Sequence, residues 1–146
     1  MSRQRKNALS NSSSPPHFLR PYRTLPEVLT DRQLARLGDA YVNFVYSLAL
    51  SEKKDQPEGR KVKGSTLAEA LRKAELREML PSRIDRHVLS DAGEALIVFA
   101  WLHRLLTLDE SVQTLIENDS LEDGLEQLLR EAKDRTMHSG LFGVHH

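Results

Sequence analysis

Apolar side chains recur at helical spacing between residues 31 and 52, and this is the clearest pattern in the chain. The preceding Thr30-Asp31-Arg32-Gln33 has the pattern of a capping box, in which side chains satisfy the first backbone N–H groups of a helix, so the helix should start near Asp31. Val42 and Ala49 extend the apolar character to a second side. We therefore expect a long helix that is buried on most of its faces. The apolar positions at intervals of three and four are Leu34, Leu37, Tyr41, Phe44, Val45 and Leu48.

Further helical segments follow, separated by polar connections. Residues 53–64 contain Pro57, Gly59, Gly64 and many charged residues, which predicts a loop. The sequence Thr107-Leu108-Asp109-Glu110 has the pattern of a capping box, in which two side chains satisfy the first backbone N–H groups of a helix. No segment alternates like a strand, so we predict an all-α fold, a helical bundle. The other predicted helices begin at Ser65 or Thr66 and end near Ala74, begin at Ser82 and end near Leu106, and begin at Asp119 or Ser120 and end near Met137.

The length of 146 residues and the composition indicate one domain. We place it at residues 25–140, after a flexible basic N-terminal arm at residues 1–24 and before a C-terminal tail at residues 141–146. The arm is rich in Ser, Pro and Arg and has no acidic residue. No apolar run approaches the roughly 20 residues that span a bilayer, so we expect no membrane association. Without cysteine or a secretory signal, the expected location is cytoplasmic.

The formal net charge is zero, yet the charges are unevenly distributed. Basic residues gather in the arm and in residues 53–63, whereas the C-terminal third is acidic. Basic patches of this kind can bind the phosphates of RNA, although short clusters are more often only solvated surface. Our candidates for RNA contact are Lys61, Lys63, Arg83 and Arg86. The two arginines could instead cap the long helix that follows them.

Three carboxylates occupy positions where the helices otherwise carry apolar residues. Asp39 lies four residues before Asn43, so both share one stripe of the first long helix. Asp91 and Glu94 share a stripe of the later long helix, with His87 one turn earlier. If the helices cross there, the three carboxylates converge into an oxygen-rich site that suits Mg²⁺ or Mn²⁺, with the amide and the imidazole at its edge.

Such an ion could activate water for attack on a phosphate. We therefore take Asp39, Asp91 and Glu94 as candidate catalytic and metal-binding residues, and Asn43 and His87 as their supporting residues. The spacing alone favours plain ion pairs, for example between Asp39 and Arg36 or Arg86, or solvent-facing charges on the later helix. Tyr41 and Trp101 are more typical of a core than of a surface that stacks on bases.

The two acidic stretches resemble the ribonuclease III endonuclease family. The family signature is Leu-Gly-Asp on one helix and Asp-x-x-Glu-Ala-Leu on a later helix. Here these read Leu37-Gly38-Asp39 and Asp91-Ala92-Gly93-Glu94-Ala95-Leu96. The resemblance implies the fold of that endonuclease domain and Mg²⁺-dependent cleavage of double-stranded RNA that leaves 5′-phosphates. It also implies a homodimer, for which we expect Val98, Trp101, Leu102 and Leu105 to form part of the surface.

Two departures from the family pattern affect the predicted function. Ala35 stands where most members carry a Glu four residues before the Asp, as it also does in the short Mini-III branch. Only six residues follow Gly140, so we expect no double-stranded RNA-binding domain, and the basic arm and loop could replace it. We predict an endoribonuclease acting on structured RNA, such as ribosomal RNA precursors. The alternatives are a catalytically inactive RNA-binding or scaffold protein of the same fold and a helical oligomerisation module.

Overall fold

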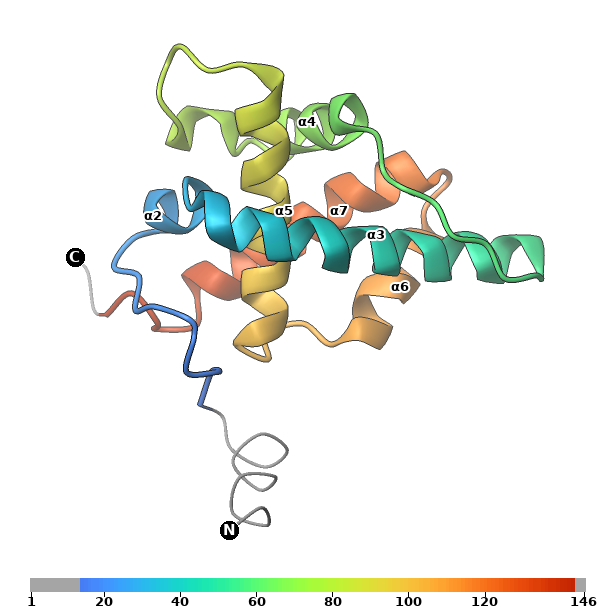
Figure 1. Cartoon of the computed structure of the whole chain (residues 1–146), viewed down its shortest axis with the longest axis horizontal. Coiled ribbons are helices and arrows are strands. Elements are labelled where there is room, and N and C mark those ends of the chain that lie inside the picture. Colours follow the sequence, from blue (N-terminus) through green and yellow to red (C-terminus); the bar gives the residue numbers. More distant parts are fainter. Residues whose placement is uncertain (1–13, 144–146) are drawn as a thin grey trace, which may run out of the picture.

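The computed structural model describes residues 14–143, which are helical with connecting turns and contain no strand. The predicted all-α class is therefore confirmed. Residues 1–13 of the predicted arm and residues 144–146 of the predicted tail lie outside the described residues. The helices in Figure 1 are α2 (Leu25–Leu29), α3 (Arg32–Lys54), α4 (Gly64–Lys73), α5 (Arg86–Leu102), α6 (Leu108–Glu117) and α7 (Leu121–Met137), with a 3-10 turn η1 (Arg77–Met79) between α4 and α5.

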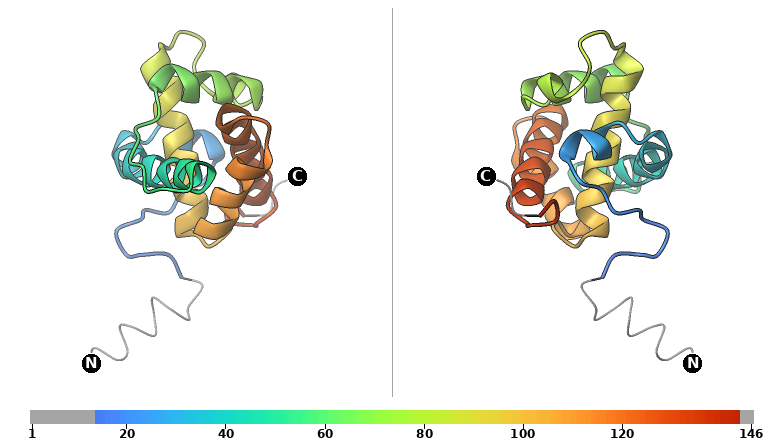
Figure 2. Two further views of the ribbon diagram at one scale, coloured as in Figure 1. Left: turned by 90° about the vertical axis from the view of Figure 1, so that its right-hand side faces the viewer. Right: turned by 90° about the vertical axis from the view of Figure 1, so that its left-hand side faces the viewer.

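Helix α5 forms the centre of the bundle. Its side chains are buried on all sides from Leu89 to Leu102, with exceptions only at Asp91, Glu94 and Trp101. Helices α2, α3, α4 and α7 all pack on it, and α3 does so most extensively. Figures 1 and 2 show α3 crossing α5 on one side while α7 lies on the other. Burial of this apolar helix supplies much of the driving force for folding.

Helix α5 is shorter at both ends than we predicted. The expected range was 82–106, but the helix spans Arg86–Leu102. At its start the backbone of Asp85 is extended, and its carboxylate accepts the N–H of Val88 at 3.1 Å. After its end Arg104 has a left-handed φ of 59°, which stops the helical path. The prediction missed that Asp85 is the better cap, because an ionised carboxylate also interacts favourably with a helix N-terminus.

Helix α3 begins next to Asp31, as predicted, but it is less buried than expected, and the predicted capping box is absent because the Thr30 hydroxyl donates to the Pro26 carbonyl at 2.8 Å instead. The carboxylate of Asp31 accepts the first backbone N–H groups of the helix. However, Leu37 and Phe44 are 40% and 52% exposed. Leu37 and Phe44 lie one turn before and one turn after Tyr41, whose ring stacks on that of the 40%-exposed Trp101 with the ring centroids 4.7 Å apart. The expectation of burial on most faces is therefore wrong along this stripe, and an apolar face remains on the surface.

The surface expected for a homodimer also needs correction. Val98 and Leu102 are buried in the core of this single chain, and Leu105 is partly buried against it. Of the four residues that we named, only Trp101 is exposed. Helical spacing showed that these residues share a stripe, but did not show which neighbouring helix covers it.

The packed part of the chain extends beyond the predicted domain limits on both sides. Tyr22, which we assigned to the arm, is buried against Phe99, and its hydroxyl donates to Asp31 at 2.6 Å. Phe142, which we assigned to the tail, packs partly against the core. Both termini of the described chain thus help to cover the outer end of α5.

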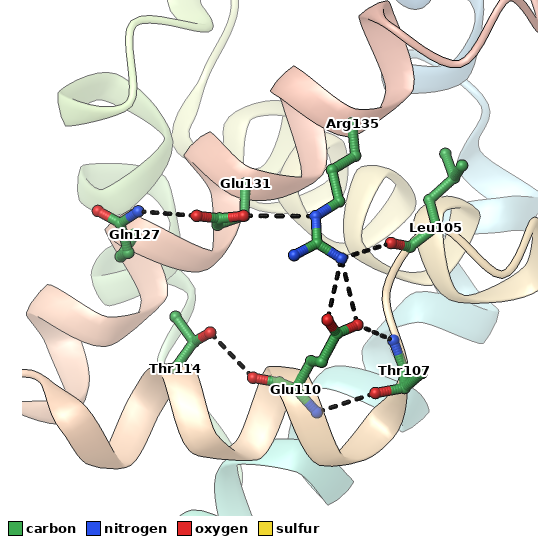
Figure 3. Close-up of polar contacts among 7 residues, drawn as sticks. All are labelled: Leu105, Thr107, Glu110, Thr114, Gln127, Glu131 and Arg135. Atoms are coloured by element: carbon green, nitrogen blue, oxygen red, sulfur yellow. Dashed lines mark hydrogen bonds and ion pairs between the residues drawn. The ribbon is translucent and has the colours of Figure 1, made fainter.

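The predicted capping box at Thr107 is present and belongs to a larger polar network, shown in Figure 3. Glu110 accepts the N–H of Thr107 at 2.9 Å and also pairs with the guanidinium of Arg135 on α7 at 3.1 Å. Arg135 further donates to the carbonyl of Leu105 at 2.8 Å and pairs with Glu131 at 3.4 Å. This network, which we call the α6–α7 network, links the turn after α5 to both C-terminal helices.

In the part of the chain that the structure describes, no helix is long and apolar enough to cross a membrane.

Candidate functional site

The site is formed where α3 crosses α5, and Gly38 makes this crossing possible. A Cβ atom at position 38 would overlap with the backbone carbonyl of Glu94. Only glycine therefore allows the two backbones to approach so closely. The next residue, Asp39, is thereby carried to the side of Glu94. The glycine of the Leu37-Gly38-Asp39 stretch thus has a direct structural reason.

Asp39 and Glu94 are in hydrogen-bonding contact through their side chains. Asn43, one turn later on α3, donates its amide to Asp39 Oδ1 at 3.2 Å. Asp91 lies one turn before Glu94 and interacts electrostatically with both of the other carboxylates. The crossing of α3 and α5 thus brings the three carboxylates and Asn43 together, which we had expected only on the condition that the two helices cross there.

The protonation of these carboxylates reflects their crowding. Burial, the hydrogen bond with Asp39 and the negative charges of Asp39 and Asp91 raise the pKa of Glu94 to about 8. Burial also raises the pKa of Asp91, against the opposing effect of the nearby Arg32. For Asp39, burial acts in the same direction, but hydrogen bonds with Glu94 and Lys61 outweigh it and lower the pKa. Asp91 and Glu94 therefore hold a proton more readily than free carboxylic acids do.

Lys61 is the basic partner of Asp39. Its ammonium lies 3.0 Å from Oδ1 and 3.1 Å from Oδ2 of that carboxylate. Our alternative interpretation had named Arg36 or Arg86 for this ion pair. Both partners are partly exposed, with 70% of the Lys61 side chain accessible, so the pair contributes little to stability. The ion pair is therefore of interest for where it places the Lys61 ammonium, beside the carboxylates, rather than for its contribution to stability.

The carboxylates line an open pocket of about 600 Å³. His87 and Lys61 line it too; we had predicted His87 beside the carboxylates, but Lys61 only as an RNA contact in the basic loop. Lys63, Arg83 and Arg86 are exposed but do not line it. The full lining consists of Arg32, Ala35, Arg36, Asp39, Lys61, Val62, Gly64, His87, Ser90, Asp91 and Glu94.

Two cationic residues of the pocket, Arg32 and Arg36, were missed by sequence reasoning as site residues. Their spacing of four residues places them on one side of the first turns of α3, ahead of Asp39. That spacing was visible in the sequence, but we had considered Arg36 only as an ion-pair partner. Ala35, between them, is buried and contributes a methyl group to the wall.

The donor set is chemically suited to a hard divalent ion. All three carboxylates supply oxygen ligands, which Mg²⁺ and Mn²⁺ prefer, and a cation between them would offset the crowding that raises the pKa of Glu94. Asp39, Asp91 and Glu94 would hold such an ion. Within residues 14–143, no group of three or more Asp, Glu or His side chains is already arranged closely enough to enclose a metal.

Comparison with known protein families shows to which family the chain is related. The family model described as Ribonuclease III matches residues 32–138, from the start of α3 to just beyond α7. A search of curated proteins returned no significant match. The matched region contains the helix crossing, the three carboxylates and Lys61. The chain therefore belongs to the ribonuclease III family.

Proposed function

We propose that the chain is a Mg²⁺- or Mn²⁺-dependent endoribonuclease that cleaves double-stranded or structured RNA. The observation that carries the proposal is the contact of Asp39 with Glu94 across two helices, in an open pocket that Asp91 also lines. Carboxylates crowded in this way need a cation to stay ionised together. Membership of the ribonuclease III family supports RNA as the substrate.

The pocket supplies groups for both parts of the reaction. A bound divalent ion supplies an activated water molecule and neutralises charge on the phosphate. Asp39, Asp91 and Glu94 anchor that chemistry, and His87 lies beside Asp91 at the rim. Arg32, Arg36 and Lys61 face the same space and suit the phosphates of the RNA backbone. Lys63, Arg83 and Arg86 are outside the pocket and are proposed as more distant phosphate contacts.

We further propose that the enzyme is a homodimer that joins through the exposed stripe of α3 and the end of α5. Leu37, Phe44 and Trp101 are large, apolar and exposed, and Tyr41 connects them by stacking on Trp101. Contiguous apolar surface of this kind marks interaction sites. The measurement is the molar mass in solution, which we expect to be twice the chain mass for the wild type and to fall for Phe44→Glu.

A second candidate function is RNA binding without cleavage. The observation in its favour is Ala35, a buried methyl group lining the pocket where most family members are expected to carry a carboxylate. With three carboxylates instead of four, a protein of this fold could retain the RNA surface and lose the chemistry.

Incubation with a labelled RNA duplex and Mg²⁺ separates the two candidates. Cleavage by the wild type that is lost in both Asp39→Asn and Glu94→Gln supports the enzyme. Duplex binding without cleavage in the presence of Mg²⁺ and Mn²⁺ supports the second candidate. We expect stable-RNA precursors, such as those of ribosomal RNA, to be the natural substrates.

A further inference from the structure

The polar stripe of α3 continues beyond the site and holds the segment that carries Lys61. Asp39, Asn43, Ser47 and Ser51 follow one another at intervals of four residues. Beyond Asp39, each of these side chains accepts a backbone N–H from the segment at residues 58–62, which runs back along the helix. The acceptors and their donors are Ser51 Oγ from Glu58 at 2.8 Å, Ser47 Oγ from Arg60 at 2.8 Å and Asn43 Oδ1 from Val62 at 2.8 Å.

These contacts are regular because the repeat distance of the helix matches that of the extended segment. Four residues of an α-helix rise about 6 Å. Two residues of extended chain span about 6.6 Å. Every second backbone N–H of the segment can therefore meet every fourth side chain of the helix. We call these three contacts the α3 ladder; Ser47 strengthens it by donating its hydroxyl proton to the carbonyl of Arg60 at 3.0 Å.

The α3 ladder determines where Lys61 lies. Lys61 stands between Arg60 and Val62, whose amides are both bound to the helix, so its backbone is fixed on either side. Its side chain then reaches both oxygens of Asp39, one turn before Asn43 on the same stripe. Backbone contacts on either side of Lys61, rather than the strength of its ion pair, thus direct this long and exposed side chain to Asp39.

We propose that Lys61 is a substrate-positioning residue of this site. While no divalent ion is bound, Lys61 neutralises Asp39. When a divalent ion is bound, Lys61 contacts a phosphate oxygen of the RNA instead. This inference rests on the proposed nuclease function. A divalent ion needs the same oxygens of Asp39 that the ammonium contacts, so the two cations compete for them. Once displaced, the ammonium remains tethered at the pocket, where the substrate brings new negative charge.

The test uses Mn²⁺ binding and RNA cleavage by the full chain with Lys61→Met, Lys61→Arg and a control, Lys73→Met. The control removes the same charge from the end of α4, away from the pocket. We expect Lys61→Met to bind Mn²⁺ about threefold more tightly than the wild type, since an exposed competing ion pair is lost. It should also cleave RNA with a KM raised about tenfold. Lys61→Arg should restore most of the KM, and Lys73→Met should match the wild type in both measurements.

The outcomes separate this inference from the proposed function. If the wild type binds Mn²⁺ and cleaves RNA, but Lys61→Met has the wild-type Mn²⁺ affinity or the wild-type KM, the role of Lys61 is overturned and the enzyme stands. If the wild type neither binds Mn²⁺ nor cleaves RNA, the proposed function fails and the inference fails with it.

Ser47→Ala tests the α3 ladder separately, because Ser47 does not line the pocket. Hydrogen exchange of the Arg60 amide should accelerate, and KM should rise by a smaller factor, about threefold, with kcat unchanged. Ser51→Ala, one step farther from Lys61, should affect KM less. If Arg60 exchanges faster in Ser47→Ala while KM stays at the wild-type value, or if Arg60 exchange does not change, then the ladder does not position Lys61.

Discussion

The molecule contains two clusters of acidic and basic side chains, and they differ in how far their charges are neutralised. In the α6–α7 network, Glu110 receives a backbone hydrogen bond from Thr107 and two contacts from Arg135, which lower its pKa. In the pocket between α3 and α5, burial and like charges raise the pKa of Glu94 to about 8. In the first cluster, groups of the protein itself hold the carboxylate ionised, whereas in the second Glu94 needs an added cation to stay ionised. This contrast, rather than the number of charges, separates a structural cluster from a candidate functional one.

The largest expected effect comes from removing a charge from the pocket. Glu94→Gln and Asp39→Asn should each reduce RNA cleavage on the order of 100-fold or more, because metal-assisted charge stabilisation is worth several kcal/mol. Folding should be preserved, since each amide is close in size and shape to the carboxyl group that it replaces. Cleavage rates and thermal unfolding of the same samples check this. The matched change in the other cluster, Glu110→Gln, should leave the cleavage rate near that of the wild type. Equal losses of activity in both clusters would remove the distinction between them.

The helix crossing that assembles the pocket should be the most sensitive point of the backbone. Gly38→Ala places a methyl group against the Glu94 carbonyl, and backbone atoms cannot move aside as a flexible side chain can. We expect a loss of about 3 kcal/mol in the free energy of unfolding, at the upper end for overpacking. Denaturant titration measures it. Gly59→Ala is the control, because a Cβ there meets no atom within 4 Å. Similar stability of the two variants would show that the helices do not cross as closely as described.

The α6–α7 network should contribute to stability alone. Arg135→Met removes its ion pairs with Glu110 and Glu131 and its hydrogen bond to the Leu105 carbonyl. We expect a loss of about 1 kcal/mol, because these contacts are partly exposed. Lys133→Met, on the same helix, serves as the charge control. RNA cleavage by Arg135→Met should remain at the wild-type rate when measured below its unfolding transition; a selective loss of cleavage would connect the two clusters.

The smallest effect is a difference in pH dependence. The folded pKa of Glu94, about 8, exceeds the ordinary value of 4.5, so between these values the folded protein holds a proton that the unfolded chain has released. The contribution of Glu94 to the free energy of unfolding is therefore complete below about pH 4.5 and is lost as the pH rises through about 8. The lowered pKa of Glu110 acts in the opposite sense, and its contribution is lost as the pH falls below the ordinary range for Glu.

Melting temperatures in EDTA between about pH 2 and pH 9 measure these two slopes. Glu94→Gln should flatten the decline toward high pH and leave the acid limb unchanged, whereas Glu110→Gln should do the reverse. A decline toward high pH that persists in Glu94→Gln would show that another group causes it.

The sequence predicted the helical class and which site residues share one side of each helix, because both depend on local repeats. Spacings of three and four residues place Asp39 beside Asn43 and Asp91 beside Glu94 in any helix. Local chemistry also predicted a helix start near Asp31 and the capping box at Thr107, which the structure confirms.

The sequence could not predict what depends on the packing of distant segments. Leu37 and Phe44 fit the apolar period of α3 as well as Val45 does, yet only Val45 is covered by a neighbouring helix. Likewise, Lys61 is 22 residues from Asp39 along the chain, and only the α3 ladder brings them together. The polar residues of that ladder were visible at intervals of four, but such a stripe is also the ordinary pattern of a helix side that faces solvent.

Mn²⁺ titration by electron paramagnetic resonance tests the central claim most directly, since it asks whether the pocket is a metal site without depending on the choice of RNA. We expect one Mn²⁺ site per chain in the wild type and in Glu110→Gln, and none in Asp39→Asn or Glu94→Gln. Mn²⁺ binding of equal strength and stoichiometry in all four proteins would contradict the assignment of Asp39 and Glu94 as metal ligands.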